Sequence, residues 1–460
     1  MRPFVRLTPG KWSEHSQCAS LQKDKIRDQS PITVIKNLVL FLASFLLVMT
    51  FGEWLFPKFM DKLPLRLYGL VDKNLRILAQ SSKKTQFPKE YIAITGDSYA
   101  VGAGDWSREI QRSNFFGSPD YSPAHLIHKK TGIDVVSFGR AGAGSFDGIW
   151  LEPVSQFLYI NSVRDYRLSP PKNFLIFFYE GNDVYGDIRF LRENIKAIGD
   201  KQPEQIELKK IQYFLNTEFE KQLNKNLNNS LWKNMIFTRF LFRGVSNLMK
   251  EWFSPNKSLK ERNSPYKVVP KGKVNITLLD GKAVRLNEAL INVEKIGLPI
   301  NLQAPPQLGR TQFQKKERIT DELIELSIYV FEKSIARLAS FFPQSKINII
   351  YIPSPVSSYK IVSSHIHSRG YMQDVDVTET KVVEVKHIKL CKTIKRFAEF
   401  NQFSFVNTTK SLRQATLSDF IHGPVDWDHF NKRGYQVLSD NIAEIFLKTN
   451  EANRLDDCEY

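Results

Sequence analysis

Four short clusters of glycine and polar residues carry the groups from which a serine-based catalytic site could be built. They are Gly96-Asp97-Ser98, the glycine-rich stretch 139–144, Gly181-Asn182-Asp183, and the stretch 426–431, in which Asp426 and His429 stand three residues apart. Each of the first three directly follows a short apolar run, and the fourth precedes the last amphipathic segment. The chain order therefore has a hydroxyl first and a carboxylate–imidazole pair last.

The chemistry of these side chains is complementary. A serine hydroxyl such as that of Ser98 is a weak nucleophile until a base takes its proton. The imidazole of His429 can act as that base near neutral pH, while the carboxylate of Asp426 holds its tautomer and stabilises the imidazolium. Glycine and asparagine N–H groups nearby can donate to a developing oxyanion, and losing one such donor typically costs roughly 3–4 kcal/mol of barrier stabilisation.

Each cluster also has a plainer interpretation. Gly-Asn-Asp is an ordinary turn, glycine-rich loops often only permit positive φ, and an Asp-x-x-His pair near a helix start is often a cap with a surface imidazole. Asp428, beside His429, is an alternative orienting carboxylate. Three other histidines are interpreted as loop residues without a catalytic role; they are His365, His367 and His422.

The elements that must position these clusters follow from the apolar pattern. Five runs rich in Ile, Val and Phe predict strands at 91–95, 134–138, 173–179, 346–352 and 403–406. They do not alternate cleanly, which is typical of parallel strands buried on both faces. Helical periodicity marks 146–163, 320–341, 381–400 and 431–448. Alternating strands and helices predict a doubly wound α/β fold, so all four clusters fall on the ligand-binding edge beyond the carboxyl ends of the strands.

With this arrangement the sequence resembles the SGNH hydrolase superfamily, the GDSL-like esterases, lipases and acyltransferases. The resemblance covers about residues 91–190 and 345–450 and rests on the Gly-Asp-Ser, Gly-Asn-Asp and Asp-x-x-His motifs. It implies a three-layer α/β/α fold around a five-stranded parallel sheet with flavodoxin-like strand order.

The resemblance also implies a role for each matching residue. Ser98 would be the nucleophile, and its backbone N–H would form the oxyanion hole with Gly142 and Asn182. Asp426 would orient His429, which would act as base and then as acid.

The match to the family pattern has three departures. The glycine after the second strand could be Gly142 or Gly144, and we prefer Gly142 by its distance from the strand. Asp428 competes with Asp426, but the three-residue spacing fits the family and lets both side chains converge from one turn. Phe430 stands where the family usually has proline.

An apolar segment near the N-terminus predicts a membrane span over 32–56. Residues 37–52 are uncharged and almost wholly apolar, and the flanks bring the length to about 20–25 residues, enough for a helix to cross a bilayer. A buried core helix or a signal peptide would be the alternatives, but no A-x-A cleavage site follows. A slight excess of basic residues before the span places the N-terminus in the cytoplasm and the catalytic domain in the periplasm or outside the cell.

The net charge of +17 and the three cysteines add weaker constraints. Residues 201–320 hold 22 Lys or Arg against 10 Asp or Glu, which favours an anionic partner such as a glycan or lipid head group, although a solvated basic surface explains it equally well. No zinc-finger or RNA-binding pattern occurs, so nucleic acid is not expected as a partner.

Cys18, Cys391 and Cys458 form no metal motif, and we expect no metal, no cofactor and no structural disulfide.

The predicted organisation divides the chain into seven segments. They are a disordered tail (1–31), the span (32–56), a stalk with a helix at 65–80 (57–90), the first half of the SGNH domain (91–186), a basic insertion (187–318), the second half (319–450) and a C-terminal tail (451–460).

Three functions are compatible with this reading. An acyl-enzyme attacked by water gives an esterase acting on O-acyl esters, in the first place O-acetyl esters, of a cell-envelope or secreted polysaccharide. Attack by a sugar hydroxyl gives an O-acyltransferase, with a membrane-bound acyl donor protein as a further partner. A catalytically inactive glycan-binding scaffold is the third option, although such a binder has no need for the complete set Ser98, Asn182, Asp426 and His429.

Overall fold

The computed structural model divides the chain into two compact units, residues 1–57 and residues 58–460. The residues that it describes are 31–79, 82–107, 118–194, 196, 206–227, 233–253, 277–278, 284–285, 302–303, 319–359, 365–369, 376–416, 420–423, 426–447 and 454–459. The predicted N-terminal tail therefore lies almost wholly outside the described residues.

The first unit contains helix α1 (Pro31–Leu55), which is 25 residues long. Its apolar side chains are exposed in the protein; Leu47, for example, is 70% exposed. A helix of this length spans about 37 Å, more than the hydrocarbon core of a bilayer. It is thus long and apolar enough to cross a membrane, in agreement with the span expected at 32–56.

The second unit is built on a sheet of five strands, all parallel. They are β1 (Tyr91–Thr95), β2 (Asp134–Ser137), β3 (Asn173–Tyr179), β7 (Lys346–Ile352) and β10 (Ser404–Asn407). Their spatial order is β10-β7-β3-β1-β2. Counted along the chain this is the order 2-1-3-4-5 of flavodoxin-like folds, which changes direction beside β1 and so opens a crevice at its carboxyl end. The predicted α/β class and parallel sheet are confirmed.

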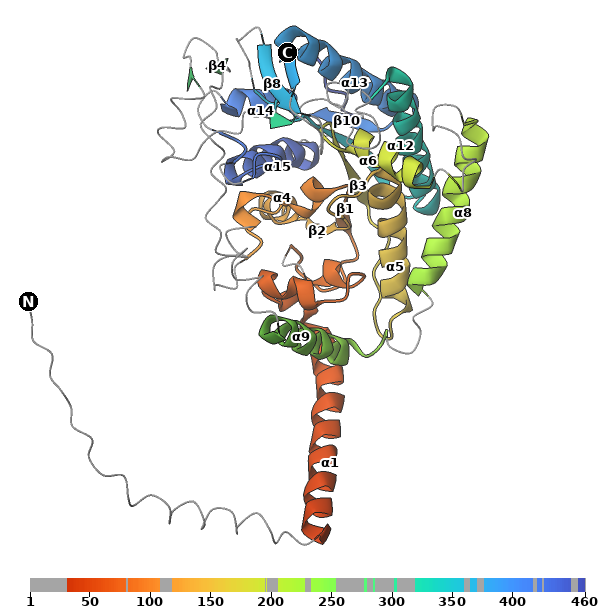
Figure 1. The fold of residues 1–460 in the computed structure, drawn as a ribbon, viewed down its shortest axis with the longest axis vertical. Coiled ribbons are helices and arrows are strands. Elements are labelled where there is room, and N and C mark those ends of the chain that lie inside the picture. The colour runs from red at the N-terminus through yellow and green to blue at the C-terminus, as the bar shows by residue number, and fades with distance from the viewer. Residues whose placement is uncertain are drawn as a thin grey trace, which may run out of the picture. The chain divides into compact units, whose positions relative to one another are not determined.

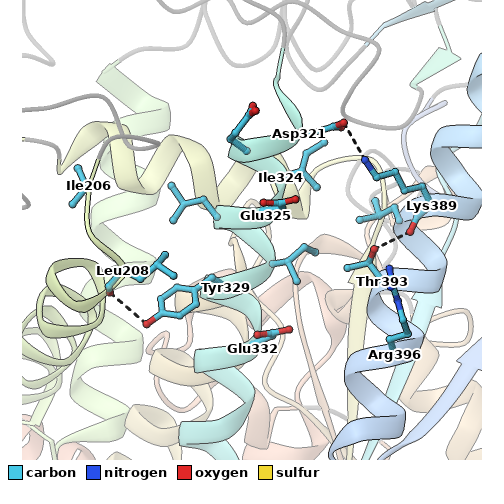
Figure 2. A pocket seen from close by; sticks show the side chains of 14 residues that line it. Ile206, Leu208, Asp321, Ile324, Glu325, Tyr329, Glu332, Lys389, Thr393 and Arg396 are labelled. Carbon is cyan, nitrogen blue, oxygen red and sulfur yellow. Dashed lines mark hydrogen bonds and ion pairs between the residues drawn. The ribbon is translucent and has the colours of Figure 1, made fainter.

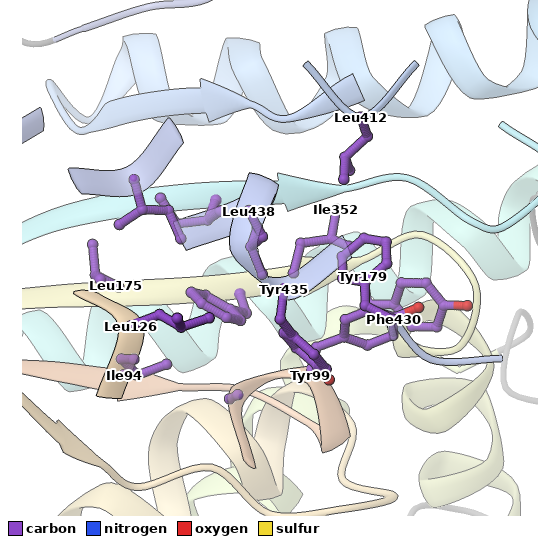
Figure 3. Close-up of a cluster of buried hydrophobic side chains, with 14 of the residues drawn as sticks. Ile94, Tyr99, Leu126, Leu175, Tyr179, Ile352, Leu412, Phe430, Tyr435 and Leu438 are labelled. Atoms are coloured by element: carbon purple, nitrogen blue, oxygen red, sulfur yellow. The ribbon is translucent and has the colours of Figure 1, made fainter. Parts of the chain in front are cut away.

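Both faces of this sheet are buried, which explains the unbroken apolar runs. On one face Ile94, Leu175 and Ile352 join a cluster with Leu126 of α4 (Pro123–Thr131) and Leu438 of α15 (Lys432–Leu447) (Figure 3). On the other face the ring of Phe178 packs edge-on against Phe331 of α12 (Asp321–Phe341), with centroids 5.0 Å apart. Because neighbouring side chains point to opposite faces, each must be apolar.

Helices connect the strands (Figure 1). They are α2 (Ser98–Val101), α4 (Pro123–Thr131), the π-helical turn η5 (Phe146–Leu151), α5 (Glu152–Ser162), α6 (Asp183–Glu193), α12 (Asp321–Phe341), α13 (Thr380–Phe400), α14 (Thr409–Thr416) and α15 (Lys432–Leu447). The four helices predicted from periodicity correspond to η5 with α5, α12, α13 and α15. The hydroxyl of Thr320 caps α12 by accepting from the N–H of Leu323, as its position before the apolar repeat indicates.

The segment expected as a stalk folds against the sheet unit from Lys58 onward. In place of one helix at 65–80 it contains three short 3-10 turns, η2 (Phe56–Lys62), η3 (Leu65–Leu70) and η4 (Arg76–Leu78). The carboxylate of Asp72 accepts from the N–H of Asn74 at 2.9 Å, a local turn that competes with a continuous helix. The N–H of Val135 donates to the carbonyl of Ser82 at 3.0 Å, which ties the segment to β2.

The interval between β3 and β7 contains the whole of the predicted insertion, 187–318, whose first residues belong to α6. The described elements after α6 are α8 (Leu208–Leu227), α9 (Ile236–Phe253) and the two-residue strands β4 (Thr277–Leu278), β5 (Val284–Arg285) and β6 (Leu302–Gln303). The last of these pairs with β8 (His365–Arg369), which in turn pairs with β9 (Asp376–Glu379). The rest of 254–318 lies outside the described residues.

The C-terminal residues have a defined place. The N–H of Phe405 donates to the carbonyl of Arg454, and the N–H of Asp456 donates to the carbonyl of Phe405, so the chain end runs beside β10. A disulfide joins Cys458 to Cys391 of α13. The expectation that disulfides have no part in this fold is therefore wrong: the two cysteines are 67 residues apart, and only the folding of the tail onto β10 brings them together.

Candidate active site

Ser98 lies where β1 ends and α2 begins, at the carboxyl edge of the sheet. Gly96 makes the turn possible: its φ is +132°, and a Cβ there would lie 2.8 Å from the carbonyl oxygen of Phe177. Asp97 caps the short helix by accepting from the N–H of Tyr99 at 2.8 Å. The Ser98 N–H belongs to the first turn, where no intrahelical acceptor exists, so it is suited to receive an anion.

Ser98, His429 and Asp426 form a continuous hydrogen-bonded chain. The hydroxyl oxygen of Ser98 lies 2.8 Å from Nε2 of His429, although the residues are 331 positions apart. Nδ1 of His429 lies 2.9 Å from Oδ2 of Asp426. Ser98 and Asp426 are each 5% exposed. The structure thus brings together the three groups that sequence reasoning selected.

The electrostatics of this chain fit an acid–base relay. Burial lowers the pKa of His429, but the hydrogen bond and charge of Asp426, with smaller contributions from Asp97 and Asp428, outweigh burial and raise it. A neutral imidazole that donates from Nδ1 to Asp426 has an unprotonated Nε2, which can accept the Ser98 proton.

The alternative carboxylate, Asp428, does not occupy the orienting position. Its backbone N–H donates to Oδ1 of Asp426 at 3.2 Å, and its backbone carbonyl accepts from Tyr99. Asp426 therefore receives this N–H on one oxygen and faces His429 with the other. Between the two carboxylates that the sequence offered, the geometry selects Asp426.

A buried aromatic cluster holds the loop that carries Asp426 and His429 (Figure 3). The ring of Tyr99 lies tilted against that of Tyr179 with centroids 4.2 Å apart and meets Phe430 edge-on at 5.0 Å. Its hydroxyl donates to the carbonyl of Asp428 at 2.7 Å. Sequence reasoning missed Tyr99; the available signal was its place directly after the nucleophile.

The other side of the same loop is held by polar contacts. The carboxylate of Asp105, which is 4% exposed, accepts from the backbone N–H of Asp426. Gly104 lets the loop approach closely, because a Cβ there would lie 2.2 Å from the carbonyl oxygen of Phe430. Both residues follow α2, so one short stretch positions the nucleophile and the acid–base pair.

Asn182, the first oxyanion-hole candidate, stands at the N-cap of α6 and is 7% exposed. Its side chain makes no capping bond; instead it donates to the carboxylate of Asp97, the neighbour of Ser98. An amide nitrogen carries two N–H groups, so one can hold this contact while the second donates to substrate. The structure brings Asn182 to the Ser98 turn.

The two glycines that sequence reasoning left open have different surroundings. Gly144 packs tightly: a Cβ would lie 2.6 Å from Oδ1 of Asp187. Gly142 is exposed, has φ +73° and has open space where a Cβ would be. Gly144 therefore packs against α6, whereas the carbonyl of Gly142 accepts from the guanidinium of Arg189 at 3.3 Å. The assignment of Gly142 to an oxyanion hole stays a prediction.

Asp187 is a second residue that sequence reasoning missed. It is fully buried on α6, and its carboxylate accepts from the N–H and hydroxyl of Ser145 at 2.6 and 2.7 Å and from the hydroxyl of Ser327 at 3.1 Å. Burial raises its pKa to about 7 against the opposing effect of these hydrogen bonds. It ties α6, which Asn182 begins, to the loop that carries Gly142.

Two more buried carboxylates lie under the site. Burial raises the pKa of Asp97, and burial together with the charge of Asp97 raises the pKa of Asp183 well above its ordinary value. The carboxylate of Asp183 accepts from the N–H of Tyr179 at 2.8 Å. Two desolvated carboxylates close together favour the protonated form of one of them.

His422, one of the histidines expected in loops, is not part of the hydrogen-bonded chain from Ser98 to Asp426. His422 is fully buried, its Nδ1 lies 3.2 Å from the hydroxyl of Tyr359, and burial lowers its pKa to about 3. It is therefore a neutral packing residue. His365 and His367 stand on strand β8, not in a loop. Within the described part of the chain, no group of three or more His, Cys, Asp or Glu residues could hold a metal ion.

A cavity of about 580 Å³ lies elsewhere, between α12 and α13 (Figure 2). Tyr329 and Glu325 of α12 and Lys389 of α13 are among its lining residues, and Lys389 bonds Asp321 at 3.0 Å across it. None of the candidate catalytic residues lines this cavity. It has a mixed charge and no nucleophile with an adjacent base, so the chemistry points to the Ser98 edge.

Comparison with known proteins gives no assignment from relatives. No family model, no curated protein and no solved structure matches the chain. The functional argument consequently depends on the residues and their geometry.

Proposed function

We propose that this chain is a membrane-tethered serine esterase of the SGNH type, with a three-layer α/β/α catalytic domain. It would remove O-acyl groups, in the first place O-acetyl, from a cell-envelope or secreted polysaccharide. The observation that carries the proposal is the hydrogen-bonded chain from Ser98 through His429 to Asp426 at the carboxyl edge of a parallel sheet.

The reaction follows from these positions. Oγ of Ser98 attacks the ester carbonyl carbon while its proton passes to Nε2 of His429. The oxyanion accepts hydrogen bonds from the N–H of Ser98, the N–H of Gly142 and the side-chain amide of Asn182. The carbon–oxygen bond to the sugar breaks, and the leaving alkoxide takes the proton from His429.

The second half returns the enzyme to its starting state. Water gives a proton to His429 and attacks the acyl-enzyme carbonyl, and the tetrahedral intermediate uses the same three donors. When it collapses, Oγ of Ser98 takes the proton back from His429, and the free acid leaves. A sugar hydroxyl in place of water would give transfer, so the acceptor decides between esterase and acyltransferase.

Two features support a location outside the cytoplasm. Helix α1 is long and apolar enough for a single membrane span. The Cys391–Cys458 disulfide is of a kind that forms and persists in oxidising compartments. Together with the slight excess of basic residues before the span, they favour a periplasmic or extracellular catalytic domain.

The first test uses the full-length protein in detergent. It should hydrolyse p-nitrophenyl acetate and take up a fluorophosphonate label at Ser98, and Ser98→Ala should abolish both. The matched control is Ser334→Ala, which removes a buried serine of α12 that bonds only its own helix among the described contacts. A folded wild-type protein that neither reacts with the label nor turns over would favour the glycan-binding scaffold.

The oxyanion assignment has its own test. Asn182→Ala should lower kcat by about 10²–10³ with little change in KM, because the lost donor acts on the transition state. An unchanged kcat would remove Asn182 from the site while leaving Ser98 in place.

The O-acyl content of the cellular polysaccharide distinguishes the esterase from the acyltransferase. Mass analysis of cellular polysaccharide with wild-type protein or Ser98→Ala should show more O-acyl groups in the variant if the enzyme is an esterase. Fewer O-acyl groups in the variant would instead identify an acyltransferase.

A further inference from the structure

Helix α9 presents an exposed apolar stripe to solvent. Phe242, Val245 and Met249, at helical spacings of three and four, are 77%, 53% and 50% exposed. Leu241 and Met235 extend the stripe and are 38% and 37% exposed. From 235 to 249 the stripe is about 21 Å long. A phenylalanine exposed to this degree within a continuous apolar row is typical of a binding surface.

The opposite side of α9 is fastened to the segment that follows the candidate span. Nη1 of Arg239 lies 2.7 Å from Oδ2 of Asp72 and 2.8 Å from the hydroxyl of Tyr159. Nη1 of Arg243 donates to the carbonyl of Val71 at 2.7 Å. Ile236 is buried on this side. The apolar stripe therefore faces solvent, because the opposite face of the helix is the one that packs against the protein.

A short stretch of chain separates the end of α1 from the segment that α9 holds. The apolar helix ends at Leu55, and the carbonyl that Arg243 holds belongs to Val71. Most residues between them form η2 and η3. A chain of this length reaches no farther than about 55 Å even when fully extended. Anchoring of α1 in a membrane would therefore keep Val71, which α9 holds, within this length of chain from the bilayer.

The composition of both elements suits a bilayer interface. Phe59 in η2 is 52% exposed, and Lys62 in the same turn is 68% exposed at its side chain. Lys250 is exposed on the last turns of α9. Aromatic and aliphatic side chains flanked by lysines are typical of helices that lie in the plane of the head groups, where the apolar face is buried about 5–10 Å deep.

We propose that α9 is an interfacial helix whose Phe242–Val245–Met249 stripe inserts into the outer leaflet of the membrane that α1 crosses. This contact gives the catalytic unit a second membrane attachment besides helix α1. The inference goes beyond the proposed activity and does not depend on Ser98.

Lipid quenching of a fluorophore tests the proposal in the full-length protein. A Cys18→Ser background leaves the disulfide intact, and Phe242→Cys supplies a site for an environment-sensitive dye. Because Phe242 is 77% exposed, this change removes little buried contact. The matched control is Asn247→Cys, which is exposed on another side of the same helix. Met249→Cys gives a second position on the stripe.

The labelled proteins are reconstituted in phosphatidylcholine–phosphatidylglycerol vesicles that contain lipids with a nitroxide near the glycerol end of the acyl chain. We expect several-fold stronger quenching at 242 and 249 than at 247. Equal, weak quenching at all three positions would overturn the proposal. Protection at 242 that depends on protein density, without lipid quenching, would identify a second copy as the occupant and would overturn it as well.

Discussion

The hydroxyl of Tyr99 donates a 2.7 Å hydrogen bond to the backbone carbonyl of Asp428, 329 residues away in the chain. Tyr99 directly follows the candidate nucleophile, and Asp428 directly precedes the candidate base. The hydroxyl of Tyr179 lies farther from the same carbonyl, at 3.4 Å. One side chain therefore couples the two halves of the site.

Tyr99→Phe should reduce activity more than stability. The ring packing remains, but the Asp428 carbonyl loses its best donor, a net cost of about 1 kcal/mol. Because the imidazole is then less well held, we expect kcat to fall by roughly tenfold, since small misplacements of catalytic groups are costly. Ester hydrolysis and thermal unfolding of the same samples check this. The control Tyr435→Phe removes a hydroxyl bonded to Ala103. It should lower stability about as much as Tyr99→Phe does but lower activity less.

Asp426→Asn should change both the rate and its pH dependence. Asp426 makes the largest contribution that raises the pKa of His429, so the variant's imidazole should lose its proton at lower pH. Activity requires neutral His429; it therefore rises with pH through this pKa, and the acid limb should move to lower pH in the variant. The loss of the correct tautomer should lower kcat by about 10⁴. The matched variant Asp428→Asn should keep most activity, and a larger loss there would reverse the assignment of the two carboxylates.

Asp187→Asn should make the stability of the protein less dependent on pH between about 4 and 7. The pKa of Asp187 is raised to about 7 by burial, so the folded state holds a proton that the unfolded state releases near pH 4. Stability must then fall as the pH rises from about 4 to 7, by on the order of 4 kcal/mol from this group. An asparagine can accept from the Ser145 N–H and donate to the two hydroxyls without this cost.

Thermal unfolding at pH 5 and pH 8 measures the effect. Between pH 5 and pH 8 the variant should lose less thermal stability than wild type, because it has no carboxylic proton to release. The exposed Asp165→Asn, whose side chain is 88% exposed, serves as the control and should follow wild type at both. Equal pH profiles for Asp187→Asn and wild type would contradict the buried-proton explanation.

Reduction of the disulfide should destabilise the catalytic unit. The Cys391–Cys458 bond closes a loop of 67 residues, which in the chain-entropy treatment corresponds to about 4 kcal/mol. We expect the melting temperature to fall on addition of a reductant, and the double variant Cys391→Ala with Cys458→Ala to melt low whether or not reductant is present. A wild-type melting temperature that does not change on addition of the reductant would show that the disulfide is not formed.

The amino-acid sequence determined the fold class and the identity of the catalytic candidates. An unbroken run of Ile, Val and Phe residues such as 173–179 can bury all its side chains only if both faces of the strand are covered by other elements. The run itself is a local property of composition. The same is true of α1, whose length and hydropathy are properties of one segment. Ser98, Asn182 and His429 were found because strand ends mark the ligand-binding edge of a parallel sheet.

Only the tertiary structure decided what depends on distance between remote segments. Asp426 and Asp428 are chemically identical two positions apart, and the direction of each side chain selects one. Gly142 and Gly144 differ because Asp187 packs on the second. The Cys391–Cys458 bond and the Tyr99–Asp428 hydrogen bond each join residues that share no local pattern. Such contacts arise when the sheet and its helices have packed, and no periodicity along the chain records them.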